Sequence, residues 1–359
     1  MSSGSPLILR TDAGVKMGTG HFMRCLALAQ AWQDRGGQTL FITACESESL
    51  RQRLVQEGFG LIPVERVHPD PLDWETTSTV LKAYPGAWVV VDGYHFDSSY
   101  QRRVREAGHL LLMIDDMAHL EHYWADVILN QNLHAETLQY SAEPNTQFLL
   151  GTHYVLLRKE FLPLASWRRE ESCNKAPHLL VTLGGTDPHK VTMKVMHALR
   201  YAGSPGLHVL LAAPDGLDGQ PELDDAVEAS HMAIEVRRDI VDMPGAMQWA
   251  DLAVSAGGST CWEMAFMQLP AVLIATEHHQ MPVIVALDEG GVALALGESE
   301  NVSTEEVAAA IDGLVRDKRK RADMGRRGRQ VVDGLGSERV AELLWTHAAR
   351  MQSRRAART

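Results

Sequence analysis

A histidine stands at the start of a predicted helix, directly after a glycine-containing loop. Residues 7–9 form a short apolar run typical of a buried strand, and residues 11–20 hold three glycines without apolar periodicity. From residue 22 the apolar side chains recur at helical spacing, which places His21 in the first turn of a helix. The positive end of a helix disfavours added positive charge, so a histidine there tends to stay neutral and can accept a proton. A purely structural loop with a capping histidine fits the same pattern.

A second turn of small residues lies in the C-terminal half, over residues 255–260. It separates an apolar run from a predicted helix, so its backbone can come close to a ligand and its N–H groups can bind a diphosphate. A tight strand-to-helix turn that needs glycine for its shape is the structural alternative. Glu263 has two interpretations as well: it completes a capping box that starts at Thr260, or it accepts hydrogen bonds from ribose hydroxyls.

Two further strand ends carry candidate residues. Gly184 and Gly185 precede an aspartate and a proline, and both are expected to border a ligand cleft. Asp187 suits the N-cap of the next helix better than the role of a catalytic acid. Tyr94 follows an apolar run and can hold a sugar hydroxyl or a nucleophilic water, or simply pack over the sheet edge.

Several motifs of other enzyme classes are missing. The adjacent Asp115 and Asp116 are accompanied by neither a D-x-D nor an H-E-x-x-H motif, and His119 and His122 have no further ligands nearby, so we predict no metal site. The sequence has no phosphate-binding G-x-x-x-x-G-K-[ST] motif, and methionine replaces the third glycine of a dinucleotide-binding motif at position 23. We therefore expect neither a P-loop ATPase nor a dehydrogenase, and no cofactor.

The elements that position these residues alternate along the chain. Short apolar runs separated by helical segments favour parallel sheets covered on both faces, and two such series predict two doubly wound α/β domains. The first series lies at residues 7–9, 40–43, 88–91, 110–114 and 127–129, and the second at 179–183, 207–212, 234–236, 252–254, 271–274 and 292–296.

The polar, aperiodic segment 166–175 is the predicted linker. We accordingly predict an N-terminal Rossmann-like domain over residues 1–165, which carries His21, and a C-terminal Rossmann-like domain over 175–335, to which the family resemblance described below assigns UDP binding. A terminal helix and basic tail occupy 336–359. Because ligands of such sheets bind beyond the carboxyl ends of the strands, two domains facing one cleft suit a nucleotide-linked substrate.

Composition limits the partners. The chain has 359 residues and a net charge of -12, which disfavours nucleic acid and anionic membranes. Its four cysteines form no C-x-x-C pair, as expected of buried free thiols in a reducing compartment. No apolar run is long enough for a signal peptide core or a membrane span, so we expect a cytoplasmic protein without membrane insertion.

Ordered segments through nearly the whole chain resemble one family. The chain resembles the UDP-sugar hydrolases of the pseudaminic acid pathway, which are grouped with spore-coat polysaccharide glycosyltransferase-like proteins. The matching segments are residues 10–12, 18–29, 92–94, 114–116, 126–132, 151–161, 182–188 and 255–263. The resemblance implies a GT-B fold, in which two Rossmann-like domains face a cleft. It also implies metal-independent release of UDP from UDP-2,4-diacetamido-2,4,6-trideoxy-β-L-altropyranose by water.

The resemblance also implies roles for individual residues. His21 resembles the catalytic base, Tyr94 the active-site tyrosine and Glu263 the ribose ligand. The family shows Asn-Gln where this chain has His279-Gln280, which places a histidine near the reacting sugar. The other residues expected to bind UDP or sugar are Arg10, Asp12, Gly18, Gly20, Gly184, Gly185, Gly257, Gly258, Ser259, Thr260 and Gln280.

The expected mechanism is a single displacement. Neutral His21 takes a proton from water, the water oxygen attacks the anomeric carbon with inversion, and UDP leaves toward the N–H groups of residues 258–260. Three alternatives stay open. A glycosyltransferase would use a sugar or lipid hydroxyl in place of water, a hydrolysing UDP-sugar epimerase would need further carboxylates, and a scaffold protein would only bind the nucleotide sugar.

Overall fold

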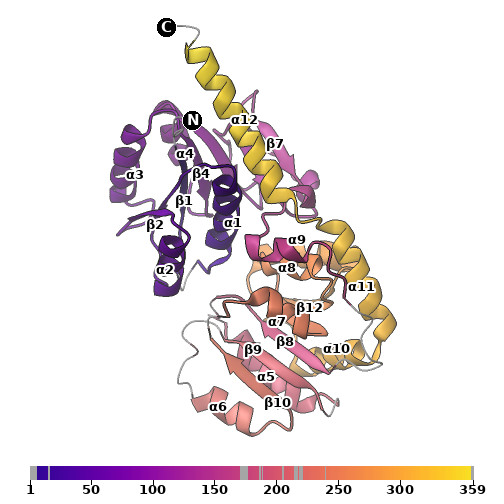
Figure 1. Ribbon diagram of the computed structural model, residues 1–359. Helices are drawn as coiled ribbons and strands as arrows, with labels where there is room; N and C mark the ends of the chain where they lie inside the picture. The colour runs from indigo at the N-terminus through magenta and orange to yellow at the C-terminus, as the bar shows by residue number, and fades with distance from the viewer. Residues whose placement is uncertain are drawn as a thin grey trace. The chain divides into compact units, whose positions relative to one another are not determined.

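The computed structural model describes residues 6–14, 17–169, 177–185, 187, 189–203, 206–213, 217, 221–238 and 240–356, with side chains up to 348. The chain divides into two compact units. The first unit consists of residues 1–159 and 334–359, and the second of residues 160–333. Each unit is built on one parallel sheet, as the alternation of apolar runs and helices predicts (Figure 1).

The first unit has a seven-stranded sheet in the order β3-β2-β1-β4-β5-β6-β7. Every pairing in it is parallel. The order reverses direction at β1, so the loops after β1 and β4 open side by side at the carboxyl edge, where ligands of such sheets bind. The strands are β1 (Leu7–Thr11), β2 (Thr39–Thr43), β3 (Gly60–Pro63), β4 (Trp88–Asp92), β5 (Leu110–Ile114), β6 (Val127–Asn130) and β7 (Gln147–Leu150).

Helices cover both faces of this sheet. Alternate residues of β1 and β4 enter two separate apolar clusters, one under α1 and the other under α4. The helices are α1 (Gly20–Asp34), α2 (Glu48–Gln56), α3 (Pro71–Ala83) and α4 (Ser98–Glu106), with short 3-10 turns η1 (Ala135–Thr137), η2 (Thr152–Tyr154) and η3 (Lys159–Leu164), the last of which begins the crossing to the second unit.

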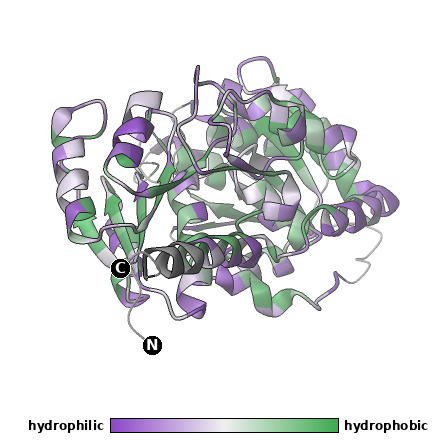
Figure 2. Ribbon diagram, turned by 90° about the horizontal axis from the view of Figure 1, so that it is seen from above, coloured by the Kyte–Doolittle hydropathy of each residue, from purple (hydrophilic) through white to green (hydrophobic). Residues whose placement is uncertain are grey.

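The second unit repeats the plan with six parallel strands in the order β10-β9-β8-β11-β12-β13. Its strands are β8 (His178–Thr182), β9 (His208–Ala212), β10 (Ala233–Arg237), β11 (Leu252–Ala256), β12 (Ala271–Ala275) and β13 (Leu294–Glu298). Its helices are α5 (Val191–Tyr201), α6 (Pro221–Glu228), α7 (Met243–Trp249), α8 (Thr260–Phe266), η4 (His278–Gln280), α9 (Met281–Glu289), α10 (Thr304–Arg316) and α11 (Lys318–Val331). Figure 2 shows apolar strands flanked by helices with hydrophilic outer faces.

The last helix, α12 (Gly336–Ala356), packs on the first unit rather than the second. Val340, Ala341 and Leu344 are buried in the cluster under α1. The indole Nε1 of Trp88 donates to the carbonyl of Leu344 at 2.9 Å, and the rings of Trp32 and Trp345 meet edge to face at 4.9 Å. The domain division predicted from sequence, which set residues 336–359 apart, differs from the structure at this helix.

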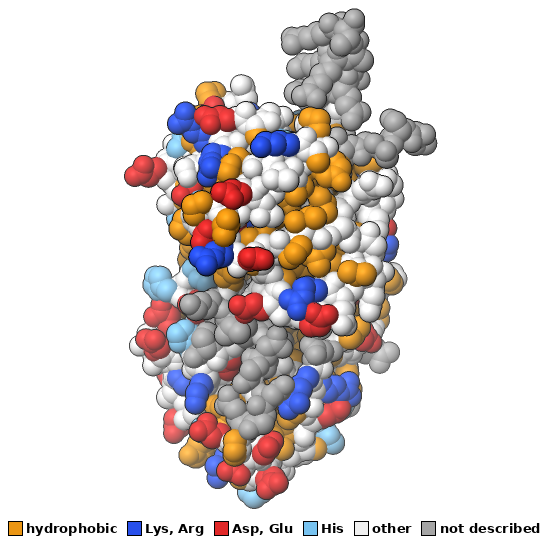
Figure 3. All heavy atoms as spheres, turned by 90° about the vertical axis from the view of Figure 1, so that its left-hand side faces the viewer, with side chains coloured by type: hydrophobic (Ala, Val, Ile, Leu, Met, Phe, Trp, Pro, Cys, Tyr) orange, Lys and Arg blue, Asp and Glu red, His pale blue; other side chains and the backbone are white. Residues whose placement is uncertain are grey.

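The remaining structural expectations have mixed outcomes. Cys25, Cys45 and Cys261 are buried free thiols, while Cys173 and most of the predicted linker lie outside the described residues. No described helix is long and apolar enough to cross a membrane. Acidic and basic side chains are interspersed on the face shown in Figure 3.

Candidate active site

His21 lies in the first turn of α1, at the carboxyl edge of the first sheet, and its imidazole is turned toward β4. The N-cap residue Thr19 makes no side-chain cap hydrogen bond. Nδ1 of His21 lies 2.7 Å from Oδ1 of Asp92, the last residue of β4. The carboxylate is fully buried and the imidazole is 13% exposed. A carboxylate can only accept, so Nδ1 is the donor in this contact, and a neutral imidazole then carries its lone pair on Nε2, the arrangement of a general base. Nη2 of Arg24 lies 3.2 Å from the same Nδ1.

Asp92 is held as a charged group by Arg24, one turn further along α1. The guanidinium donates to both carboxylate oxygens, Nε to Oδ2 and Nη2 to Oδ1, each at 2.7 Å. Burial alone would raise the pKa of Asp92, but the positive charge of Arg24 and the hydrogen bonds from Arg24 and His21 outweigh it and lower the pKa. Asp92 therefore stays ionised beside the base.

Arg24 also binds a second carboxylate, that of Asp116 after β5. Nη1 of Arg24 donates to Oδ1 of Asp116 at 2.8 Å, and the amide of Asn132 donates to the same oxygen at 2.8 Å. The other oxygen accepts the hydroxyl of Tyr94 at 2.9 Å. Burial opposes ionisation of Asp116, yet Arg24 lowers the pKa of this carboxyl well below its usual range. One arginine thus joins the residue that holds His21 to the residue that holds Tyr94.

Tyr94 stands beside the base. Its ring meets the ring of His21 edge to face, with 4.6 Å between the centroids. Burial and the neighbouring Asp116 raise the pKa of the phenol far above its usual range, so Tyr94 keeps its proton. The Tyr94 hydroxyl thus bonds to Asp116 while its ring packs against His21, and its contact with a sugar hydroxyl or a water stays a prediction.

The adjacent aspartates do not act as a pair. Asp115 faces the opposite way from Asp116 and accepts the hydroxyls of Tyr123 at 2.9 Å and Tyr140 at 3.1 Å. Its Oδ1 also accepts two backbone N–H groups of the following turn. No group of three or more potential metal ligands occurs among the described residues.

Arg10 and Asp12, both expected to bind substrate, belong to a buried network. Arg10 is fully buried and pairs with Asp73 of α3 and with Asp12. Asp12 also accepts the backbone N–H of Ala44 and lies 3.0 Å from Nε2 of His95. The Arg10 side chain is committed to the interior, so we leave these two residues out of the proposed substrate site.

The glycines before α1 shape its approach. Gly18 has a φ of +68°, a conformation that favours glycine, and its N–H bonds to the carbonyl of Gly14 at 2.8 Å. Gly20 is the first residue of α1. This tight loop delivers His21 to the sheet edge.

In the second unit, the turn after β11 combines close packing with open space. A Cβ on Gly257 would lie 2.6 Å from Cγ2 of Ile284 and 2.8 Å from Cβ of Gln280, whereas a Cβ on Gly258 would meet nothing within 4 Å. Oε1 of Gln280 accepts the N–H of Gly257 at 3.2 Å and that of Thr276 at 3.0 Å. Gln280 therefore fixes the turn, while Gly258 and the half-buried Ser259 and Thr260 form its accessible part.

Glu263 and His279 lie close to this turn in sequence. Ser259, not Thr260, is the N-cap residue of α8, and its side chain makes no cap hydrogen bond, so the predicted capping box starting at Thr260 is wrong. Glu263 lies in the first turn of α8 and is half-buried. His279 lies in η4, directly before Gln280, and is also half-buried.

The turn after β8 is the third predicted element of this unit. Gly184 is exposed with a φ of +106°, and Gly185 is half-buried. The carboxylate of Asp187 accepts the N–H groups of Val191 at 2.8 Å and Thr192 at 2.7 Å. Asp187 therefore binds the first N–H groups of α5 from the preceding loop. The N-cap residue itself is Lys190, so the prediction that Asp187 occupies the N-cap position is wrong.

Comparisons with known proteins agree with this architecture. Residues 207–335 match the family model for the glycosyltransferase family 28 C-terminal domain. The spore coat polysaccharide biosynthesis protein SpsG of Bacillus subtilis is 23% identical over 336 residues, which cover 93% of this chain and 96% of SpsG. A UDP-N-acetylglucosamine–N-acetylmuramyl-(pentapeptide) pyrophosphoryl-undecaprenol N-acetylglucosamine transferase of Anaeromyxobacter dehalogenans is 27% identical over 50% of this chain.

Apart from SpsG, the chain spans about half the length of these curated relatives: 48% of the A. dehalogenans transferase, and 54% of an uncharacterized protein of Methanocaldococcus jannaschii. Among solved structures, MurG of Acinetobacter baumannii has a TM-score of 0.66 at 17% identity, covering 95% of this chain and all of that one. HepE of Anabaena in complex with UDP-glucose has a TM-score of 0.63 at 12% identity, covering 96% and 100%.

These likenesses and the two parallel sheets define the class: the chain has the fold of the GT-B glycosyltransferases. The sequence named His21 and Tyr94 but missed the role of the three residues that hold them, Arg24, Asp92 and Asp116. The signal available was their position at strand ends and on the first turns of α1, although nothing in a sequence reports an ion pair between residues 92 positions apart.

Proposed function

We propose that this protein uses a UDP-sugar as a glycosyl donor, with a hydroxyl group as acceptor and His21 as the general base. The observation that carries the proposal is the 2.7 Å contact between Nδ1 of His21 and the ionised Asp92 at the carboxyl edge of the first sheet. The GT-B fold, the family 28 match of the second unit and the UDP-glucose bound by HepE support a UDP-sugar as donor.

The chemistry follows from the tautomer of His21. Nε2 of His21 takes the proton of the acceptor hydroxyl while the oxygen of that hydroxyl forms a bond to the anomeric carbon. The bond from this carbon to the UDP oxygen breaks, and UDP leaves with the electron pair. Asp92 accepts the hydrogen bond from Nδ1 throughout and stabilises the imidazolium that forms. A single displacement from the face opposite UDP inverts the anomeric configuration.

The turn from Gly257 to Thr260 is the proposed diphosphate site. Gly257 lets the chain pack against Ile284, and the open side of Gly258 leaves room for phosphate oxygens next to the backbone. Glu263, one turn further on, is the proposed partner of the ribose hydroxyls. Gln280 acts here through the turn it fixes rather than by touching the ligand.

Hydrolysis is the second candidate, since water can replace the acceptor hydroxyl without any change at His21. What supports it is the ordered series of segments, from residues 10–12 to residues 255–263, that resembles the hydrolases of diacetamido-trideoxy sugars. His279 stands where that family has asparagine, so the sugar could differ from theirs.

One experiment separates the candidates. The purified protein is incubated with a panel of UDP-sugars, including UDP-N-acetylglucosamine and UDP-diacetamido-trideoxy sugars, with and without a mixture of alcohol acceptors. UDP release and products are followed by mass spectrometry. A glycosylated acceptor supports transfer, and free sugar formed without acceptor supports hydrolysis. Absence of UDP binding by calorimetry would overturn both.

A further inference from the structure

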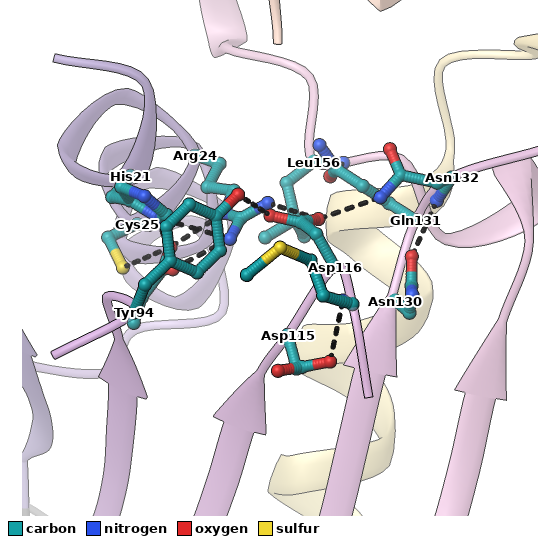
Figure 4. Close-up of polar contacts among 12 residues, drawn as sticks. His21, Arg24, Cys25, Tyr94, Asp115, Asp116, Asn130, Gln131, Asn132 and Leu156 are labelled. Carbon is teal, nitrogen blue, oxygen red and sulfur yellow. Dashed lines mark hydrogen bonds and ion pairs between the residues drawn. The ribbon is translucent and has the colours of Figure 1, made fainter. Parts of the chain in front are cut away.

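Asp116 receives hydrogen bonds from three donors and, as an ionised carboxylate, can only accept. Its Oδ1 receives Arg24 and Asn132, each at 2.8 Å, and its Oδ2 receives Tyr94 at 2.9 Å. An ionised carboxylate has no proton to give, and the direct contact with the guanidinium of Arg24 keeps it ionised. Figure 4 shows the Tyr94 hydroxyl pointing at this carboxylate and away from the sheet.

The direction of one hydrogen bond follows from this. A phenol has a single proton, and in Tyr94 that proton is spent on Asp116. Whatever else the hydroxyl oxygen meets, it can therefore only accept. Nδ1 of His21 likewise faces a carboxylate that can only accept, that of Asp92, so Nδ1 is the donor in that contact. Two carboxylates joined by Arg24 thus set the hydrogen-bond direction of the Tyr94 hydroxyl and of Nδ1 of His21.

We propose that Asp116 and Arg24 are positioning residues that lock Tyr94 as a hydrogen-bond acceptor, so that Tyr94 selects substrates carrying a hydroxyl or amide N–H group at the position it faces. This inference rests on the proposed function, because the selected group belongs to the bound UDP-sugar. A substrate with fluorine or an ether oxygen at that position would place an acceptor against the Tyr94 oxygen, which is also an acceptor. No proton would lie between them to form a hydrogen bond. Leaving a polar group of this kind without its partner costs about ten- to hundredfold in affinity.

The isosteric change Asp116→Asn should reverse the direction of the hydrogen bond between residue 116 and Tyr94. Two donors, Arg24 and Asn132, meet Oδ1, so the amide oxygen of the variant will take that place. Its NH₂ group then faces Tyr94 and donates to the hydroxyl, which turns its own proton toward the ligand. The shape of the site stays the same, and the bidentate contact of Arg24 with Asp92 is retained.

The lock is tested first without ligand, by NMR of the full chain with labelled tyrosine. The hydroxyl proton of Tyr94, assigned by its loss in Tyr94→Phe, should give a slowly exchanging downfield signal that moves upfield or vanishes in Asp116→Asn. Asp115→Asn is the matched control: that neighbouring buried aspartate also accepts tyrosine hydroxyls, but those of Tyr123 and Tyr140. A Tyr94 signal unaffected by Asp116→Asn would overturn the lock.

Selection is tested by the affinities of UDP-glucose and its 2-, 3-, 4- and 6-deoxyfluoro analogues, measured by calorimetry. Wild type should bind one analogue about ten- to hundredfold more weakly than UDP-glucose. That ratio should fall toward one in Tyr94→Phe and in Asp116→Asn, and the double variant should match Tyr94→Phe. Thermal unfolding checks that each variant is folded, and the ratio cancels any general loss of affinity.

The outcomes distinguish a failure of selection by Tyr94 from a failure of the proposed function. Equal affinities across the series in wild type, or a fluorine penalty that persists in Tyr94→Phe, would overturn selection by Tyr94. If neither UDP nor any nucleotide sugar of the series binds, the proposed function is overturned. The selection by Tyr94, which rests on that function, is then overturned as well. A missing hydroxyl signal counts against the lock alone.

Discussion

Arg24 and Asp92 meet through two hydrogen bonds of 2.7 Å, Nε to Oδ2 and Nη2 to Oδ1, although 67 residues separate them in the chain from helix α1 to the end of β4. This paired geometry fixes the carboxylate in the plane of the guanidinium, and Oδ1 of the same carboxylate lies beside the imidazole of His21. The base is thus oriented by an ion pair rather than by a single flexible side chain.

His21→Asn should abolish turnover and leave UDP binding intact. An amide cannot take the proton that Nε2 takes, and general bases contribute about 10²- to 10⁴-fold to rate. Steady-state rates and UDP calorimetry measure the two properties separately. The exposed His231→Asn serves as the matched control and should behave as wild type. Retention of more than half of the turnover rate in His21→Asn would remove His21 from the mechanism.

Acid should destabilise the first unit through Asp92 and Asp116. Both have a lowered pKa in the folded protein, so their contribution is present above the unfolded pKa of about 3.9 and is lost as pH falls through the folded pKa. Urea unfolding between about pH 3 and 5 should show a smaller slope of unfolding free energy with pH in Asp116→Asn than in wild type. The difference is at most about 1.4 kcal/mol per pH unit, one proton. Identical slopes would mean that Asp116 carries no such linkage.

Two alanine substitutions at adjacent glycines should have different effects. Gly257→Ala places a methyl group 2.6 Å from Ile284 and should lower the melting temperature. Gly258→Ala meets no neighbouring atom, so stability should be unchanged while UDP affinity falls because the methyl group occupies the proposed diphosphate space. Thermal unfolding and calorimetry of both variants form an internal control. Unaltered UDP affinity in Gly258→Ala would exclude this turn from the nucleotide site.

Glu263→Ala should weaken UDP binding by about 1–3 kcal/mol, the range expected for hydrogen bonds to a charged group. A UDP analogue without the ribose hydroxyls serves as the control. If Glu263 holds the ribose, wild type should bind UDP more tightly than 2′,3′-dideoxy-UDP, and the variant should bind both alike. A variant that still prefers UDP by the wild-type factor would assign the ribose to another residue.

His279→Asn tests the position where the chain departs from the family it resembles. An imidazole titrates near neutral pH and an amide does not, so contact with the reacting sugar predicts a changed pH profile or sugar preference with UDP affinity unchanged. Kinetics across pH with two UDP-sugars measures both. Profiles identical to wild type for both substrates would place His279 outside the sugar site.

The sequence-based fold prediction was most accurate where strands are buried on both faces. All eleven apolar runs overlap strands, and nine of these strands are mostly buried, because near-continuous apolar residues suit the interior of a parallel sheet. The other two, β10 and β13, are edge strands of the second sheet with half-buried or exposed residues. The two missed strands are β3 (Gly60–Pro63) and β7 (Gln147–Leu150), which lie at the two edges of the first sheet. Their residues are largely exposed or half-buried, so their pattern is weak.

A site residue could be predicted from the sequence only where its position is set by residues close to it in the chain. His21 can be placed by its loop and helix, whereas Asp187 binds the start of α5 from the preceding loop and Lys190 occupies the N-cap position. The sequence could not show that Arg10 is a buried structural residue rather than a substrate ligand, since its burial against Asp73 depends on a helix more than 60 residues away. The same distance problem concealed the bridge from Arg24 to Asp116, although each partner occupies a strand end or helix start that the sequence identifies.

The return of α12 to the first unit makes that unit discontinuous, with residues 160–333 inserted between its two parts. During synthesis the ribosome completes the inserted unit before the helix that covers Trp32 and Trp88 has been made. The nascent chain therefore carries an uncovered apolar surface under α1 until α12 emerges, and a premature stop before residue 334 would leave that surface open to chaperones and proteases.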